Sequence, residues 1–187
     1  MKKTTLRLMA LVALATFTIT SCKKDKVEDN DNEVITTMTL TLTPVSGGTP
    51  LTFTYDDPDG PGGNAPTQQA ISLPANRSYT AAVTLLNKTV NPVVNVTTDV
   101  AAEATAHRFY YIPTAGVNVS VSGLNNDANG VPLGITSTWT TTTASTGNLK
   151  VTLRHYPGTP PNKATADLVT DSKSSTDIEV NFAVTIL

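Results

Sequence analysis

Apolar and polar residues alternate with a period of two along most of the chain from residue 34 onward. In the segment 177–187, an apolar side chain occupies every second position from Val180 to Ile186. The segment 37–43 does the same, with threonine at each polar position. Such alternation predicts strands with one buried and one exposed face. Shorter strands are predicted over 51–55, 70–73, 79–87, 93–98, 106–112, 116–122, 134–143 and 149–156.

Turn-forming residues separate these segments and leave little room for helices. Glycine and proline are concentrated in 56–66, and Asn129-Gly130 is a typical hairpin turn. Only 98–105, with three alanines, favours a short helix. Many short strands without a long amphipathic helix predict an all-β fold, namely an antiparallel β-sandwich of immunoglobulin-like type with at most one short helix. The long segment 157–176 has no strand pattern, and we expect it to be either mobile or functional.

The N-terminal residues have the features of an export and anchoring signal. A basic start and the apolar run 8–19 are typical of a signal peptide, because the run is too short to span a bilayer. The chain's single cysteine, Cys22, follows directly in an Ile-Thr-Ser-Cys sequence that resembles a bacterial lipobox. We therefore expect a signal peptide over 1–21, lipidation of Cys22, a flexible charged tether over 22–33 and one β-sandwich domain over 34–187. The alternative is an ordinary secretory signal with a chance cysteine.

Composition and charge exclude several classes of protein. Threonine is the most frequent residue, which favours strands over helices. A formal net charge of -2 argues against binding to nucleic acid, which needs a basic surface. One cysteine excludes both a disulfide framework and a thiolate zinc site. Because no nucleophile elbow, P-loop, dinucleotide fingerprint or metalloprotease motif is present, the sequence predicts no enzyme.

The two histidines are the residues with the most distinctive site chemistry. His107 shares a predicted strand face with Phe109, and His155 shares one with Leu153, so both point toward the apolar side. His107 opens its strand and His155 closes its own, so antiparallel pairing would bring the two imidazoles together. With the carboxylate of Glu103 they would suit Zn²⁺ or Cu²⁺. The alternative is a pair of partly buried histidines that bind backbone or tyrosine groups, since two histidines fall short of a complete site.

Two loops resemble calcium-binding loops. The segment 125–130 reads N-x-D-x-N-G, close to the calcium-loop consensus, with Asp127 as its only acid. The other loop contains Asp56, Asp57 and Asp59. The alternative for both segments is a plain hairpin or connecting loop, because the expected bidentate acid is missing from the first.

The opposite faces of the two histidine strands carry cationic and aromatic side chains. Arg108 and Tyr110 flank His107 and Phe109, and Arg154 and Tyr156 flank His155. Such a set could form a surface for a protein partner or a glycan. The alternative is the ordinary exposed face of an amphipathic sheet.

Four segments resemble one family: EATAHRFYY (103–111), LNNDANGVPLGI (124–135), LKVTLRHYPGTPPN (149–162) and TDIEVNFAVTI (176–186). Together with the lipobox they are similar to the small Bacteroidota lipoproteins labelled "type 1 periplasmic-binding fold superfamily". That label implies two α/β lobes, whereas the strand pattern here predicts a β-sandwich. The resemblance implies a lipid anchor at the outer membrane and a TonB-dependent outer-membrane receptor as a partner.

The sequence as a whole predicts a non-enzymatic binding lipoprotein of the cell envelope. We expect its ligand, a divalent metal or another small molecule, at the end of the sheet that carries His107 and His155. The alternative function is a structural or adhesive surface module without a small-molecule site. A hydrolase would need a serine or aspartate within hydrogen-bond reach of a histidine.

Overall fold

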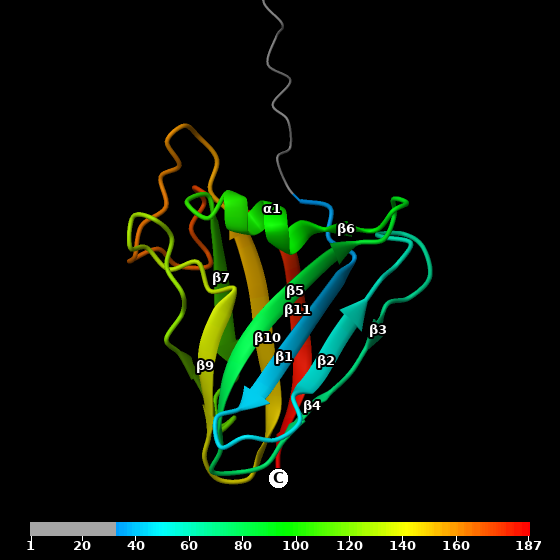
Figure 1. Ribbon diagram of the computed structural model, residues 1–187, viewed down its shortest axis with the longest axis vertical. Helices are drawn as coiled ribbons and strands as arrows, with labels where there is room; N and C mark the ends of the chain where they lie inside the picture. The colour runs from blue at the N-terminus through cyan, green and yellow to red at the C-terminus, as the bar shows by residue number, and fades with distance from the viewer. Residues whose placement is uncertain (1–32) are drawn as a thin grey trace, which may run out of the picture.

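The computed structural model describes residues 33–187. The predicted signal peptide over 1–21 and the predicted lipidation site at Cys22 lie outside the described residues, as does the predicted tether up to residue 32. The described chain is mostly β, with two largely antiparallel sheets and one short helix (Figure 1). Within this range, no helix has both the length and the hydropathy needed to cross a membrane.

The first sheet contains the N-terminal strands. Its order is β3 (Thr67–Gln68), β2 (Leu51–Asp56), β1 (Thr37–Pro44), β5 (Ser78–Asn87), β9 (Thr136–Thr141) and β8 (Val119–Ser122), with β6 (Val94–Asn95) paired to the end of β5.

The second sheet contains the C-terminal strands and the two histidines. Its order is β4 (Ile71–Leu73), β11 (Ser175–Ile186), β10 (Ser145–His155) and β7 (His107–Pro113). The pairing of β4 with β11 is parallel, which corrects the prediction of a purely antiparallel arrangement. The reason is that the chain crosses from the first sheet to the second between Gln68 and Ile71, so β4 joins the edge without a hairpin.

The two sheets enclose one hydrophobic core. The period-two pattern directs alternate side chains inward, and the burial of β11 follows it from Ile178 to Ile186. The largest fully buried side chains come from both sheets and include Trp139, Phe109 and Phe182. Burial of apolar area at roughly 25 cal/mol per Å² is the main favourable term that holds the sheets together.

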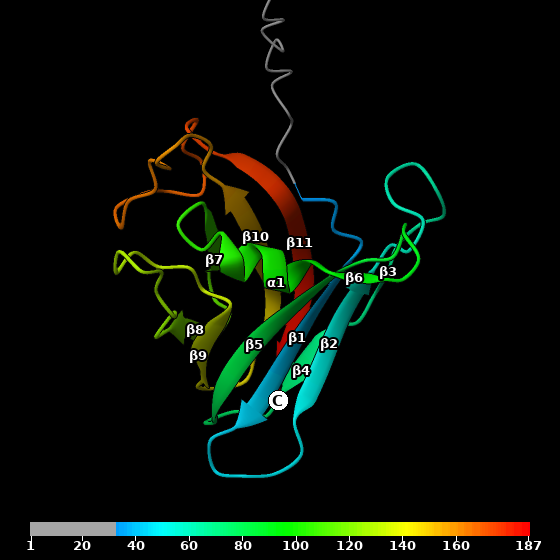
Figure 2. The ribbon, with the colours of Figure 1, turned by 45° about the horizontal axis from the view of Figure 1, so that its top comes forward.

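Helix α1 (Val96–Ala102) lies across one end of the two sheets (Figure 2). It starts at Asn95, whose side chain accepts a hydrogen bond from the Thr97 N–H, and not at the predicted position 98. Val96 and Val100 are buried. The helix ends at Glu103, whose N–H donates to the Asp99 carbonyl, and the chain then turns into β7 at His107. The helix therefore positions the residues around the candidate site.

Candidate metal centre

Strand pairing brings the two histidines side by side. His107 begins β7, His155 ends β10, and the antiparallel register places them directly opposite each other. Their ring centroids are 4.8 Å apart, and the ring planes are tilted by 31°. Both residues are buried, with 0% and 6% exposure. The arrangement expected from antiparallel pairing is the one that the structure has.

A carboxylate that the sequence analysis did not select completes this cluster. In the β10–β11 pair, Leu153 lies opposite Ile178 and Arg154 lies opposite Thr176, so Asp177 is the extra residue of a β-bulge. Strict alternation would place Asp177 on the exposed face. The bulge reverses this, and the Asp177 side chain is 0% exposed. His107, His155 and Asp177 each offer a ligand atom, and these atoms lie within 4.8 Å of one another.

The hydrogen bonds of His107 leave one ring nitrogen facing Asp177. His107 Nδ1 lies 3.2 Å from the Glu103 carbonyl oxygen, so Nδ1 carries the proton and Nε2 carries a lone pair. That Nε2 is 3.6 Å from Asp177 Oδ2. Among the described residues, neither Nε2 nor either oxygen of Asp177 has a partner with good hydrogen-bond geometry, although the backbone N–H of Glu33 is close enough to Asp177 to lower its pKa. When Asp177 is ionised, the two groups are therefore buried acceptors that face each other without a proton between them.

Burial shifts the pKa values of Asp177 and His107 in opposite directions. It raises the pKa of Asp177 to about 7, with the charges of Glu33 and Glu103 adding to the rise, while the backbone of Glu33 and the charge of Arg154 lower it. Burial also lowers the pKa of His107 to about 4. The contact with the Glu103 carbonyl opposes that change. The His107 imidazole is therefore neutral at neutral pH, the form that binds metals.

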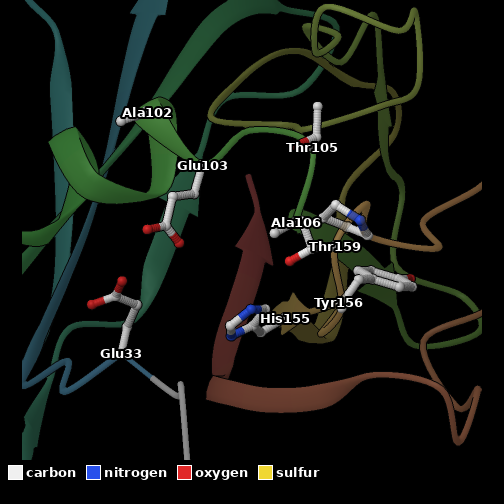
Figure 3. A pocket seen from close by; sticks show the side chains of 10 residues that line it. Glu33, Ala102, Glu103, Thr105, Ala106, His155, Tyr156 and Thr159 are labelled. Carbon is white, nitrogen blue, oxygen red and sulfur yellow. The ribbon is translucent and has the colours of Figure 1, made fainter. Parts of the chain in front are cut away.

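An open pocket of about 600 Å³ leads to this cluster (Figure 3). His155 lines it together with Glu33, Glu103 and residues around the end of α1 and the start of the 157–176 segment. Figure 3 shows the carboxylates of Glu33 and Glu103 pointing toward each other across the pocket. Glu103, predicted as the carboxylate of the site, is exposed at this rim. Its carbonyl contacts His107 Nδ1, and its carboxylate forms a second group with Glu33 and His107 whose ligand atoms lie within 4.8 Å of one another. Asp177 is the carboxylate that lies close to both histidines.

The donor set of the cluster suits a transition metal. Two neutral imidazoles and one carboxylate are ligands of Zn²⁺ and Cu²⁺. Metal-ligating histidines usually donate their second ring N–H to a backbone carbonyl or a carboxylate, as His107 does with the Glu103 carbonyl. Three protein ligands leave a coordination position open, and the pocket supplies a route to it. The residues present therefore fit a metal ion.

The candidate calcium loop at Asp127 is neutralised by a lysine. Asp127 Oδ1 accepts the N–H groups of Asn129 and Val131, and Oδ2 lies 2.8 Å from Lys163 Nζ. Both charged side chains are 1% exposed. The ammonium of Lys163 thus takes the position that a cation would need, which argues against a calcium site here.

The second candidate loop also lacks a converging set of oxygens. Asp56 pairs with Lys88 at 2.6 Å and accepts a hydrogen bond from Thr37. Asp59 accepts the backbone and side-chain N–H groups of Asn64. Asp57 is the third acid of the loop. Among residues 33–187, these three aspartates do not form a group whose ligand atoms converge on one point.

The side chains of the predicted partner surface bind another segment of the same chain. Arg108 donates to the carbonyls of residues 164, 165 and 167, and Tyr110 donates to the Asp167 carbonyl. Arg154 donates to residues 171, 174 and 176, and Tyr156 is fully buried with its hydroxyl 2.6 Å from that of Tyr110. These side chains therefore hold the 157–176 segment against β7 and β10 and do not form an open patch.

Comparison of the chain with protein families, with curated proteins and with solved structures gave no match.

Proposed function

We propose that the protein is a lipid-anchored binding protein of the bacterial cell envelope that holds a divalent transition metal, Zn²⁺ or Cu²⁺, through His107, His155 and Asp177. The observation that carries this proposal is the 3.6 Å separation between His107 Nε2 and Asp177 Oδ2, two buried acceptors without a hydrogen-bond partner among residues 33–187.

The distance between the two atoms is compatible with a shared metal ion. A normal hydrogen bond between these atoms would be about 2.7–3.2 Å long. Two ligands of one tetrahedral zinc ion, each about 2.0–2.1 Å from the metal, lie about 3.3 Å apart. The observed 3.6 Å is longer than a hydrogen bond and within about 0.3 Å of the separation of two zinc ligands. A small inward movement of the two side chains would bring both atoms into coordination.

Burial of these unpaired groups is costly when no metal is bound. A buried carboxylate without a partner costs several kcal/mol, and a buried lone pair adds about 1–3 kcal/mol. Asp127, which is equally buried, is neutralised by Lys163, so the fold does pair its buried acids elsewhere. A divalent cation would neutralise Asp177 and satisfy the lone pair of His107 at once. Buried polar groups that lack a partner are typical of a binding site.

The cellular setting is proposed from the sequence. The lipobox at Cys22 and the similarity to Bacteroidota lipoproteins support an outer-membrane anchor and a TonB-dependent receptor as partner. As part of the same proposal, we take the two-sheet fold to be an immunoglobulin-like sandwich. The protein would then present a metal for uptake without chemical change, because no catalytic motif accompanies the site.

A metal-loading experiment tests the binding function. The full chain is stripped with a chelator, dialysed against Zn²⁺ or Cu²⁺ and analysed by mass spectrometry for bound metal. We expect about one ion per wild-type chain, and a loss of at least tenfold in affinity for His155→Ala and for Asp177→Asn. Glu179→Gln is the matched control, because Glu179 lies on the same strand but on its exposed face.

Absence of binding by the wild type would overturn the metal proposal and leave the structural or adhesive module as the function. Equal binding by wild type and Asp177→Asn would place the metal elsewhere and would also overturn it.

A further inference from the structure

We infer that an exposed loop, residues 89–95, docks on the membrane that carries the lipid anchor, with Val90, Val93 and Val94 in contact with a zwitterionic bilayer surface. This segment is called the valine loop below. The inference rests on the lipid anchor of the proposed function and is independent of the metal site. It adds a second membrane contact to the acyl chains proposed at Cys22.

The valine loop is apolar, uncharged and exposed. It reads Thr-Val-Asn-Pro-Val-Val-Asn, leads out of β5 and includes β6. Every residue in it is exposed, and Val90, Val93 and Val94 are 45%, 52% and 40% exposed. Single apolar side chains scattered over a surface are normal, but several in one short loop mark an interaction site.

Strand pairing places the valine loop beside the point where the chain enters the fold. On one side of β5, Val94 lies opposite Asn87. On the other side of β5, the Thr36 N–H donates to the Leu86 carbonyl, just before β1 begins. Neighbouring strands are about 4.8 Å apart, so two such spacings, roughly 10 Å, separate the loop from the start of β1. Val34, another exposed valine, precedes β1 there.

The end of the domain that carries the valine loop is the end that the anchor would hold. Figures 1 and 2 show β6 and the beginning of the described chain at the same end as α1, opposite the C-terminus. Cys22 precedes Glu33 by eleven positions, and a chain of that length spans at most about 40 Å. A bilayer that holds acyl chains at Cys22 is therefore within reach of the loop. Tethering raises the effective concentration of lipid there, so a weak apolar contact suffices for docking.

The composition of the valine loop favours lipid over a protein partner. The centres of protein–protein interfaces are enriched in aromatic residues, methionine and arginine, and the energetically dominant residues are mostly tryptophan, tyrosine and arginine. The valine loop contains none of these. Valine side chains transfer favourably into hydrocarbon, and the affinity of such a contact grows with the apolar area that it buries.

The charges next to the valine loop favour a zwitterionic over an anionic bilayer. Lys88, the residue before the loop, is neutralised by Asp56 at 2.6 Å, and this ion pair joins the valine loop to the aspartate-rich segment 56–66. Asp57 and Asp59 in that segment form no ion pair with a basic side chain among residues 33–187. An anionic surface would repel these carboxylates within a Debye length, whereas a zwitterionic surface would not.

Site-specific fluorescence on the acylated full chain in phosphatidylcholine vesicles tests this inference. Val93→Cys supplies a thiol for an environment-sensitive dye, because acylation occupies the thiol of Cys22. The matched control is Val45→Cys, since Val45 is 64% exposed in the turn after β1, at the opposite end of the domain (Figure 1). We expect a blue shift of the dye emission and quenching by brominated acyl chains at residue 93, and neither at residue 45. Adding Val90→Asp and Val94→Asp should abolish both signals, because a carboxylate is costly in a lipid contact.

The outcomes separate this inference from the anchor on which it rests. Mass spectrometry of the wild type before labelling shows whether Cys22 is acylated, and a free thiol there would overturn the anchor itself. In acylated protein, equal signals at residues 93 and 45 would overturn the docking of the valine loop and leave the anchor in place. Quenching that the two aspartates leave unchanged would overturn the role of the valines. Stronger quenching in phosphatidylglycerol vesicles would overturn the preference for a zwitterionic surface.

Discussion

Lys163 and Asp127 form a buried ion pair, with Nζ 2.8 Å from Oδ2 and both side chains 1% exposed. Lys163 also donates to the carbonyls of Ala104 and His107. The long segment 157–176 is therefore joined to the start of β7, where the first histidine of the metal site lies. The contacts of this segment make it a support for the site.

We predict that Lys163→Met destabilises the protein by about 3 kcal/mol, because it leaves the Asp127 carboxylate buried without its partner. The matched control is Lys150→Met. Lys150 pairs with Glu179 at the same 2.8 Å, but both side chains are more than 40% exposed. That change should cost less than about 1 kcal/mol. Urea unfolding measures both. If both variants lose the same free energy of unfolding, the buried Lys163–Asp127 pair contributes no more to stability than the exposed Lys150–Glu179 pair.

A second prediction concerns the metal-free protein and pH. The raised pKa of Asp177, about 7, means that the folded state keeps a proton that the unfolded state loses near pH 4. The stability that this proton provides is present at low pH and is lost as the pH rises to about 7. His107, with its pKa lowered to about 4, acts in the opposite sense between about pH 4 and 6.5. Comparison with Asp177→Asn isolates the carboxyl.

Chelator-treated Asp177→Asn should therefore gain stability over chelator-treated wild type between pH 5 and pH 8, by about 2–3 kcal/mol. Thermal unfolding at the two pH values measures the gain. Glu179→Gln, which changes an exposed carboxylate on the same strand, should show no such gain. A constant difference between Asp177→Asn and wild type across this pH range would contradict the burial of an unpaired carboxylate.

Metal binding should stabilise the fold. At a free Zn²⁺ concentration of 100 times Kd, the expected stabilisation is about 2.7 kcal/mol, which corresponds to a rise in Tm of about 5–10 °C for a chain of this size. Because its affinity is at least tenfold weaker, His155→Ala should gain at most about half of this stabilisation at the same Zn²⁺ concentration. Differential scanning calorimetry with and without Zn²⁺ is the measurement. A similar rise in both proteins would indicate binding away from His155.

The anchoring prediction depends on residues outside the described range. Cys22→Ala should remove the acylation site and leave the exported protein in the soluble fraction, because the lipid chains provide the membrane affinity. Detergent phase partitioning of cell envelopes distinguishes the two forms. If Cys22→Ala partitions with the detergent as the wild type does, the lipoprotein proposal is wrong.

The strand pattern and the pairing of the histidines follow from local information. Alternation in β11 gave the correct inner face from Ile178 to Ile186, because one buried face imposes a period of two. His107 and His155 lie at opposite ends of their strands in the sequence, so a single assumption, antiparallel pairing, brings them together. The strand faces need no knowledge of distant contacts, and the histidine pair needs only this one.

Asp177 and Lys163 could not be predicted in the same way. A β-bulge adds one residue to a strand and reverses which face the next side chain takes, and the pattern in 176–186 does not show where the bulge falls. Lys163 lies in a segment without periodicity, and its partner Asp127 is 36 positions earlier. The position of such a contact depends on the completed sheets. From the sequence, the nearest acid to His107 is Glu103, and its carboxylate lies in a second converging group with Glu33 and His107.

X-ray absorption spectroscopy at the zinc edge, on the full chain loaded with one equivalent of Zn²⁺, examines the ligands of the metal. We predict a four-coordinate spectrum with two imidazoles and oxygen ligands at about 2.0–2.1 Å, and the loss of one imidazole in His155→Ala. A spectrum without imidazole, or one that His155→Ala leaves unchanged, would contradict a metal centre at His107, His155 and Asp177.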